Sequence, residues 1–281
     1  MIPPPSASLI YGIIVHVGLA HRVITKVVSV LSLGGGVNST ALLLTLVRKG
    51  ESPDLVLFAN TGGERPSTIA HVAFIGDWCS EQGIEFKEVT NGGRGQGETL
   101  EENMLARKEL PSLAYGFKGC SVKWKRQPLD RYVRDWKPAT EAWERGEKVM
   151  RLIGIDAGER HRAVLDEDKR YRYRYPLVEW DMGRDECVKE IEQAGWEVPS
   201  KSACFYCPAM RRNEILQLKD EHPDLLERAL EIERNAETHS VAGLGRNWKW
   251  VDFLRQDSAQ GKLWADPPEM ACGCLDESDD D

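Results

Sequence analysis

The stretch that decides the fold covers residues 26–44 and reads KVVSVLSLGGGVNSTALLL. Residues 27–33 are β-branched and mostly apolar, which is typical of a strand that is buried on both faces of a sheet. The three glycines that follow allow a tight turn and a close approach of the backbone to a ligand. We expect a helix to begin at Ala41, with three N-cap candidates before it, Asn38, Ser39 and Thr40.

This strand, turn and helix predict an anion site. A helix N-terminus offers unpaired N–H groups and the positive end of the helix dipole to a phosphate. Three consecutive glycines are more than a corner without a ligand requires, which favours the anion site over a plain turn. A Walker loop would need a lysine that is absent here, and a Rossmann loop would need a small residue at Ser39 and an acid at Asn60.

Strands and helices alternate along the rest of the chain. We predict strands over 54–60, 84–89 and 148–155, and a helix over 67–80. This alternation indicates an α/β protein with a doubly wound parallel sheet in a Rossmann-like α/β/α sandwich, whose ligands bind at the carboxyl ends of the strands. Residues 208–233 are expected to be helical and broken at 222–223. The predicted divisions are an N-terminal extension, a nucleotide-binding domain and a C-terminal helical extension, over 1–25, 26–235 and 236–281.

Composition and charge narrow the class of protein. A chain of 281 residues is long enough for one large α/β domain with a sizeable core. The formal net charge is −8, and much of the acid lies in residues 276–281. An acidic total argues against a general nucleic-acid coat but not against a local basic groove. The apolar run at 9–20 is too short to span a bilayer and has no preceding positive charge, so we expect a cytoplasmic protein that does not bind membranes.

The glycine turn resembles a known nucleotide loop. Residues 32–39, SLGGGVNS, are similar to the Ser-x-Ser-Gly-Gly-x-Asp/Thr-Ser pyrophosphate loop of the adenine nucleotide alpha-hydrolase superfamily, which has a HUP-type fold. Gly34 stands where that pattern has a serine, and Asn38 where it commonly has an aspartate. Residues 58–62, FANTG, resemble the second nucleotide-contacting segment of the family. The resemblance implies nucleotide contacts at Ser32, Gly34, Gly35, Gly36, Asn38, Ser39, Thr40, Asn60, Thr61 and Gly62.

Later motifs resemble the phosphoadenosine phosphosulfate (PAPS) reductase branch, including its small phage-borne members. Residues 119–129, GCSVKWKRQPL, are similar to its Cys-Ser-x-x-(x)-Lys-x-x-Pro segment, and residues 153–162 to its Ile-Gly-Ile-x-x-x-Glu-x-x-Arg element. Cations beside a thiol favour the thiolate and also bind phosphate or sulfate. A solvated basic helix start and a salt-bridged surface loop are the alternatives. The anion-binding candidates from these segments are Lys123, Lys125, Arg160 and Arg162.

Seven cysteines without a secretion signal indicate metal or redox use rather than a disulfide framework. Cys204 and Cys207 form a Cys-x-x-Cys pair that can reach one metal ion or cluster iron, while a catalytic dithiol or two unliganded cysteines remain alternatives. In the family that the chain resembles, this run accompanies a 4Fe–4S cluster or zinc, which implies a ligand set of Cys120, Cys204, Cys207 and Cys274. The tail near Cys272 loosely resembles that of the reductases, so Cys120 and Cys272 are the catalytic candidates. Cys79 and Cys187 are expected in the core.

The resemblance implies an enzyme that binds ATP or adenylyl sulfate. Its chemistry would be sulfonucleotide reduction or adenylation-coupled sulfur transfer, which makes it an oxidoreductase or a sulfurtransferase. A thioredoxin-like electron donor or a cysteine desulfurase would be its partner. The alternative is a non-catalytic module that binds nucleic acid or protein and keeps the fold and the metal-bound cysteines. Residues 169–175, KRYRYRY, could then stack on bases, although an edge strand with a basic solvent face explains them equally well.

Overall fold

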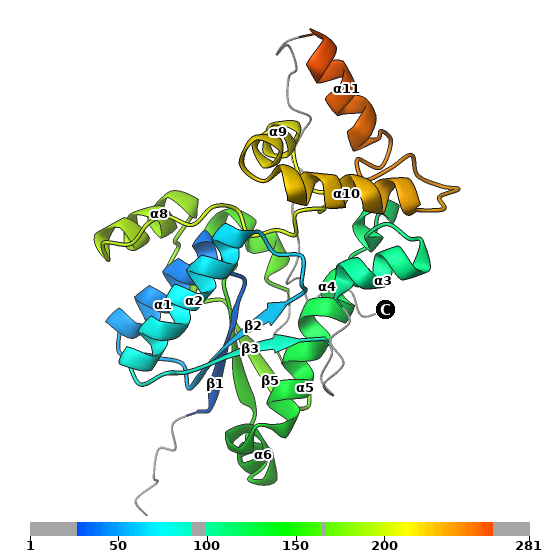
Figure 1. Ribbon diagram of the computed structural model, residues 1–281. Helices are drawn as coiled ribbons and strands as arrows, with labels where there is room; N and C mark the ends of the chain where they lie inside the picture. Colours follow the sequence, from blue (N-terminus) through cyan, green and yellow to red (C-terminus); the bar gives the residue numbers. More distant parts are fainter. Residues whose placement is uncertain (1–26, 92–98, 165–166, 261–281) are drawn as a thin grey trace, which may run out of the picture.

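The computed structural model describes residues 27–91, 99–164 and 167–260 (Figure 1). The predicted N-terminal extension, the acidic tail and two of the candidate site cysteines, Cys272 and Cys274, lie outside the described residues.

The described residues form one five-stranded sheet in which every pair of neighbours is parallel, in the order β3-β2-β1-β4-β5. Its strands are β1 (Ser29–Leu33), β2 (Leu55–Asn60), β3 (Glu85–Thr90), β4 (Val149–Ile153) and β5 (Tyr171–Arg174). The strands predicted at 27–33, 54–60, 84–89 and 148–155 are confirmed. The chain starts at β1 in the middle of the sheet and continues through β2 to β3 at one edge. It then returns to the other side of β1 and continues through β4 to β5, so the strand order reverses between β1 and β4.

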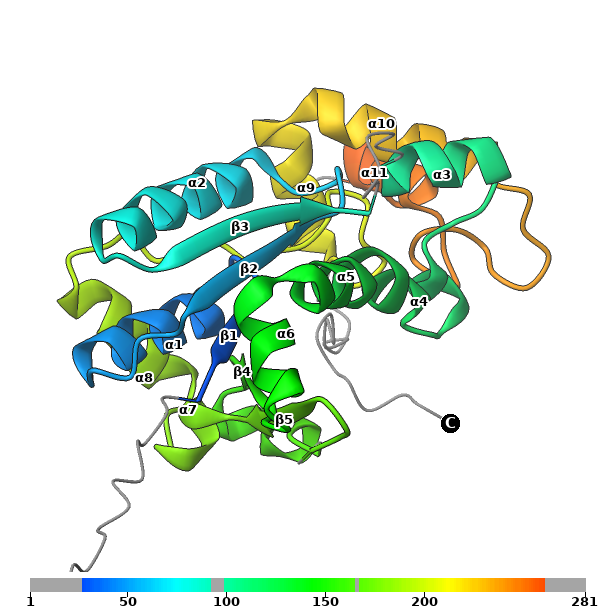
Figure 2. The ribbon, with the colours of Figure 1, turned by 90° about the horizontal axis from the view of Figure 1, so that it is seen from below.

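Helices cover both faces of the sheet (Figure 2). One face packs against α1 (Val37–Arg48), α2 (Pro66–Glu81) and α8 (Arg184–Gln193), and the other against α5 (Gln127–Asp135) and α6 (Lys137–Glu144). Side chains alternate between these layers, because Leu31 and Val56 join the first cluster while Val30 and Leu55 join the second. The predicted doubly wound α/β/α sandwich is therefore confirmed.

A third cluster of buried side chains lies beyond the carboxyl ends of the strands. It joins α3 (Leu100–Arg107), α9 (Arg212–Glu221), α10 (Pro223–Asn235) and α11 (Trp250–Gln260), which stack together in Figure 1. The predicted break at 222–223 is present, whereas residues 208–211, expected to be helical, precede the first turn of α9. Leu226 and Trp250 belong to one cluster, so packing continues across residue 235. No helix of the described ranges is long and apolar enough to cross a bilayer.

Short helical pieces complete the architecture. These are η1 (Ser112–Tyr115), η3 (Ala157–Arg162) and α7 (Pro176–Glu179). In addition, α4 (Gly119–Ser121) and η2 (Val122–Arg126) run without interruption into α5. The turn η2 is π-helical, with Gln127 N donating to Val122 O, five residues back. Such turns are rare and often occur at functional sites.

The expected start of α1 at Ala41 is wrong. The helix begins at Val37, its N-cap is Gly36, and no side chain caps it. The hydroxyls expected to cap the helix instead lie inside its first turn and donate back to Gly36 O, from Ser39 at 3.2 Å and from Thr40 at 2.9 Å. This back-bonding is the alternative use of a Ser or Thr hydroxyl near a helix start.

The expected core positions of Cys79 and Cys187 are confirmed. Both thiols are fully buried, Cys79 in α2 and Cys187 in α8. Burial raises the pKa of each thiol to about 12, so both are neutral at physiological pH.

Candidate functional site

A large cavity opens where the strand order reverses, at the carboxyl ends of β1 and β4. Its volume is about 590 Å³, which lies in the range of small-molecule sites. We call it the switch cavity. It is lined by Leu33, Gly34, Gly36, Val37, Asn38, Ser39, Phe58, Ala59, Lys125, Leu129, Ile153, Gly154, Ile155, Asp156, Glu159, Arg162, Arg184, Lys201 and Ser202. This is the place where open parallel sheets bind ligands.

The glycine turn forms one wall of the switch cavity. Gly35 has a φ of +74°, and a Cβ there would lie 3.1 Å from methyl groups of both Thr68 and Val72. A Cβ on Gly36 would come within 2.9 Å of Ser202 Oγ. Glycine at position 35 therefore lets the backbone turn tightly against α2 and present the N-terminus of α1 to the cavity, while Ser202 lies close to Gly36.

A polar network at the cavity links α1, α8 and the segment that follows β4. Asn38 Nδ2, on α1, donates to Asp156 Oδ2 at 2.9 Å, and Arg184 Nη1 donates to Asn38 Oδ1 at 3.2 Å. Asp156 follows β4, is 6% exposed, and also accepts from Glu159 N. Gly154 permits this approach, because a Cβ there would lie 3.0 Å from the Ser39 backbone.

Two of the four predicted cations line the switch cavity. Lys125 comes from η2, and Arg162 from η3, where its Nη1 lies 2.5 Å from Glu159 Oε1. Lys123 is exposed beside the Trp124 ring, and Arg160 pairs with Asp181 on the surface. Neither of these two is among the lining residues.

The remaining predicted nucleotide residues divide between the cavity wall and its support. Gly34, Gly36, Asn38 and Ser39 line the switch cavity, whereas Ser32, Gly35, Thr40, Asn60, Thr61 and Gly62 do not. Thr40 Oγ1 also lies 3.0 Å from His71 Nε2, and Gly62 N donates to Asn60 Oδ1. Thr61 faces a second cavity.

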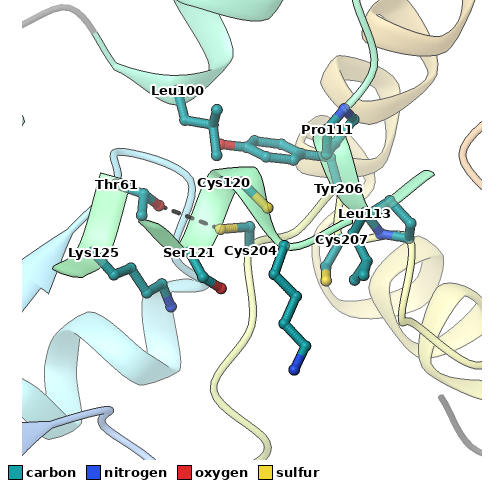
Figure 3. A pocket seen from close by; sticks show the side chains of 12 residues that line it. Thr61, Leu100, Pro111, Leu113, Cys120, Ser121, Lys125, Cys204, Tyr206 and Cys207 are labelled. Carbon is teal, nitrogen blue, oxygen red and sulfur yellow. Dashed lines mark hydrogen bonds between the residues drawn. The ribbon is translucent and has the colours of Figure 1, made fainter. Parts of the chain in front are cut away.

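This second cavity, the cysteine cavity, has a volume of about 40 Å³. It is lined by Thr61, Leu100, Pro111, Leu113, Lys118, Cys120, Ser121, Lys125, Cys204, Tyr206, Cys207 and Pro208. Figure 3 shows three cysteines from two distant segments gathered around it. Cys120 comes from α4, and the Cys-x-x-Cys pair comes from a turn in which Cys207 N donates to Cys204 O. The predicted grouping of Cys120 with that pair is thus present around one cavity, and Lys125 lines both cavities.

A buried carboxylate lies next to the cysteine cavity. The Glu64 side chain is fully buried, and its Oε1 accepts from Thr61 Oγ1 at 3.1 Å and lies 3.5 Å from Lys125 Nζ. Thr61 Oγ1 is 3.2 Å from Cys204 Sγ. The Tyr206 ring fills the space over Gly63, where a Cβ would lie 2.1 Å from the tyrosine oxygen. Burial raises the pKa of Tyr206 well above its ordinary value.

The thiols of the cysteine cavity have the donor chemistry that zinc and iron–sulfur clusters select. Within the described ranges, however, no three His, Cys, Asp or Glu side chains are already arranged as a metal site. The fourth predicted ligand, Cys274, lies outside the described residues. The ligand types therefore fit a thiolate-bound centre, while the described part of the chain does not complete its coordination.

The basic and aromatic residues of 169–175 form the edge strand β5, so the edge-strand interpretation is confirmed. Its arginines pair with acids, Arg172 with Glu167 and Arg174 with Glu179. Both arginines are thus paired with acids, and neither lines either cavity.

Sequence reasoning missed several residues of the two cavities. Asp156 could have been found, because it directly follows the predicted fourth strand at the carboxyl edge where ligands bind. Glu64 lies in the turn after β2, and nothing in the sequence around it predicts that a charged side chain there would be buried. Arg184 and Lys201 are brought in by distant segments and had no local signal.

No protein-family model matches the chain. Two curated proteins of Methanocaldococcus jannaschii are similar to it. The uncharacterized protein MJ0066 is 27% identical over 81% of this chain and 45% of its own length. The uncharacterized protein MJ0973 is 22% identical over 79% of this chain and 51% of its own length. The chain therefore spans about half the length of the curated relatives that it matches.

Among solved structures, the U34-tRNA thiolase NcsA from Methanococcus maripaludis, with its 4Fe–4S cluster, is similar over 81% of this chain and 80% of its own. The TM-score is 0.41 and the sequence identity is 16%. A likeness of this size does not establish a shared activity or a shared ligand.

Proposed function

We propose that the chain is an enzyme that binds an adenine nucleotide in the switch cavity and performs sulfur chemistry at the cysteine cavity. The observation that carries this proposal is that Lys125 lines both cavities. One cavity holds a glycine turn at a helix N-terminus, and the other holds three thiols. A nucleotide bound in the first would thus have its phosphates close to the thiols of the second.

The residues of the switch cavity suit a nucleotide. The N-terminus of α1 presents backbone N–H groups to phosphates. Four cations against two carboxylates leave the lining positive, which favours an anion (Lys125, Arg162, Arg184 and Lys201 against Asp156 and Glu159). The apolar part of the lining, which includes Phe58, Leu129 and Ile155, suits a purine base.

Two reactions are compatible with this arrangement. In sulfonucleotide reduction, a cysteine thiolate attacks the sulfur of adenylyl sulfate, an S–S bond forms, and AMP leaves with the electron pair of the broken S–O bond. A second thiol then displaces sulfite and forms a disulfide, which a thioredoxin-like dithiol reduces. In sulfur transfer, an acceptor oxygen attacks the α-phosphorus of ATP and pyrophosphate leaves. The terminal sulfur of a cysteine persulfide, formed by a cysteine desulfurase, then displaces AMP from the acceptor. A second thiol breaks the resulting S–S bond, releases the thiolated acceptor and forms a disulfide, which an external dithiol reduces.

The cysteine cavity fits a metal centre in its ligand types. Cys120, Cys204 and Cys207 would hold a 4Fe–4S cluster or zinc, with Cys274 as the predicted further ligand. A cluster would supply a Lewis-acidic iron, whereas zinc would hold the thiolates in place. Iron, zinc and acid-labile sulfide measured on anaerobically purified protein distinguish the two, and Cys204→Ser should lower the bound metal in either case.

Nucleotide binding is tested by placing a carboxylate at the N-cap of α1. Gly36→Asp should keep the fold, because the backbone at Gly36 is extended, with a φ of −109°, and the Ser202 hydroxyl that a Cβ would meet lies at the end of a short side chain that can rotate away. Aspartate is also a favourable N-cap residue, but its charge should repel a phosphate at the same N-terminus. His222→Asp is the matched control, since it adds a carboxylate at the N-cap of α10, outside both cavities. Calorimetry with ATP and with adenylyl sulfate should show binding to the wild type and the control, and at least tenfold weaker binding to Gly36→Asp. Equal affinity of Gly36→Asp and wild type would refute the nucleotide site.

Product analysis separates the two reactions. Sulfite and AMP formed from adenylyl sulfate and a dithiol identify a reductase. Pyrophosphate formed from ATP when a sulfur acceptor is present, together with AMP formed only when a sulfur donor is also present, identifies a sulfurtransferase. Neither product from either nucleotide, in protein whose metal content is intact, would refute an enzyme of this kind.

A further inference from the structure

The side chain of Lys125 lies between the two cavities and lines both of them. Its side chain is 11% exposed, and it lines the cavity with the glycine turn as well as the cavity with the three thiols. A buried ammonium group is costly unless a negative partner stabilises it. Two features therefore determine which groups the Lys125 ammonium can reach: the backbone turn that directs the side chain, and the negative side chain that pairs with it.

The π-helical turn η2 sets the direction of the Lys125 side chain. Cys120 and Lys125 are five residues apart, and in an α-helix that spacing would place them about 140° apart around the axis. In a π-helical turn each backbone hydrogen bond joins residues five apart instead of four. Two side chains five residues apart therefore point to a similar face of the helix. Both side chains accordingly line the cysteine cavity, while Trp124 between them is buried in the neighbouring hydrophobic cluster.

Glu64 supplies the negative partner. Its Oε1 is 3.5 Å from Lys125 Nζ and is held in place by the Thr61 hydroxyl. Its Oε2 is buried without a hydrogen-bond partner in the described part of the chain. A carboxylate in this environment needs a cation close by, because desolvation strongly disfavours an unpaired charge.

We propose that Glu64 is a positioning residue that holds Lys125 between the two cavities, so that one ammonium contacts the nucleotide phosphates and faces the thiols. The inference rests on the proposed function and deepens it. Lys125 would be the catalytic residue of the pair, because it touches the nucleotide, and Glu64 would act only through it. The buried carboxylate prevents the lysine from swinging out to solvent, which keeps the ammonium in position before the nucleotide arrives.

A double-mutant cycle on nucleotide affinity tests this relation. Lys125→Met removes the ammonium while keeping much of the side-chain volume, and should weaken nucleotide binding about tenfold or more, as expected for one charged contact to phosphate. Glu64→Gln should weaken binding by a similar factor, because the ammonium is no longer held. The double variant should bind no more weakly than Lys125→Met alone, since Glu64 has no effect without its lysine.

Two further variants separate positioning from a general loss of structure. Glu190→Gln removes the same charge from an ion pair with Arg48 at the C-terminal end of α1 and should leave affinity unchanged. Glu64→Asp keeps the charge and should recover part of the affinity lost in Glu64→Gln. Thermal unfolding of every variant establishes which are folded at the assay temperature. If Glu64→Gln is unfolded at that temperature, Glu64→Asp takes its place in the cycle, both as a single variant and in combination with Lys125→Met.

The outcomes distinguish this inference from the proposed function. Wild-type chain that binds neither ATP nor adenylyl sulfate would refute the proposed function, and the inference with it. Wild-type binding with additive effects in the cycle would refute only the inference, because Glu64 would then act independently of Lys125. An affinity that rises in folded Glu64→Gln would also overturn it, since Glu64 would then compete with phosphate for the lysine.

Discussion

Gly35 is the position where the packing of the glycine turn can be tested most sharply. Replacement by alanine introduces a Cβ at a φ of +74°, which costs about 1–2 kcal/mol for an L-residue in the left-handed region. The same Cβ would lie 3.1 Å from methyl groups of both Thr68 and Val72 on α2. Forcing one extra methyl into a packed site costs about 1–3 kcal/mol more. We therefore expect Gly35→Ala to lower the free energy of unfolding by about 2–5 kcal/mol in total.

Gly50 provides the matched control. Its φ of +72° is nearly the same, but a Cβ there would meet no atom within 4 Å. Gly50→Ala should therefore lose only the conformational part, about 1–2 kcal/mol. Equilibrium unfolding in urea, followed by circular dichroism and tryptophan fluorescence, gives both values. Equal destabilisation by the two substitutions would refute the packing of the turn against α2, and with it the close approach that presents the N-terminus of α1 to the switch cavity.

Three further predictions concern groups outside the proposed nucleotide site. Glu233→Ala should lower the free energy of unfolding by about 3 kcal/mol or more, because it removes the acceptor of three backbone N–H groups, those of Leu244, Trp250 and Val251; an unfolding curve like that of wild type would contradict this. Cys79 and Cys187 should resist iodoacetamide in the folded protein at mildly alkaline pH, since burial raises the pKa of each thiol to about 12; labelling of either at the rate seen in urea, measured by mass spectrometry, would show that they are exposed. Burial lowers the pKa of His71, and the negative charge of Glu197 opposes this shift only in part. The contribution of neutral His71 to stability is therefore present above its pKa in the unfolded chain, about 6.5, and is lost as the pH falls toward its pKa in the folded protein. Between about pH 7.5 and about pH 5.5 the wild type should thus lose more unfolding free energy than His71→Gln, and parallel losses would exclude this role.

The fold could be predicted because its signals are local. Strands β1 and β2 are mostly apolar and their side chains alternate between two buried faces, which is typical of sheets that are covered on both sides. The turn at Gly34 and Gly36 was recognisable from glycine content alone. The start of α1 was misplaced because Ser39 resembles an N-cap in sequence, and only the structure shows its hydroxyl bonded back to Gly36 O.

The site could be predicted only in part, because several of its charged side chains come from segments that lie far apart in the sequence. The family resemblance implies the grouping of Cys120 with the Cys-x-x-Cys pair, but it does not indicate that Glu64 is buried beside them. The direction of Lys125 depends on the π-helical turn η2, which the local sequence pattern does not predict. Arg160 and Arg162 were equivalent candidates in sequence, yet η3 turns only Arg162 toward the switch cavity.

Nucleotide and thiols should meet at Lys125, and a crystal structure with a bound adenine nucleotide would show whether they do. ATP with a non-reactive phosphate linkage, or adenylyl sulfate with the cysteines mutated to serine, keeps the complex intact. We expect phosphate oxygens at the N-terminus of α1, within hydrogen-bond distance of Lys125 Nζ, with the reactive end directed at the cysteine cavity. A nucleotide bound elsewhere, or one whose phosphates lie in the switch cavity but point away from Lys125 and the thiols, would contradict the account.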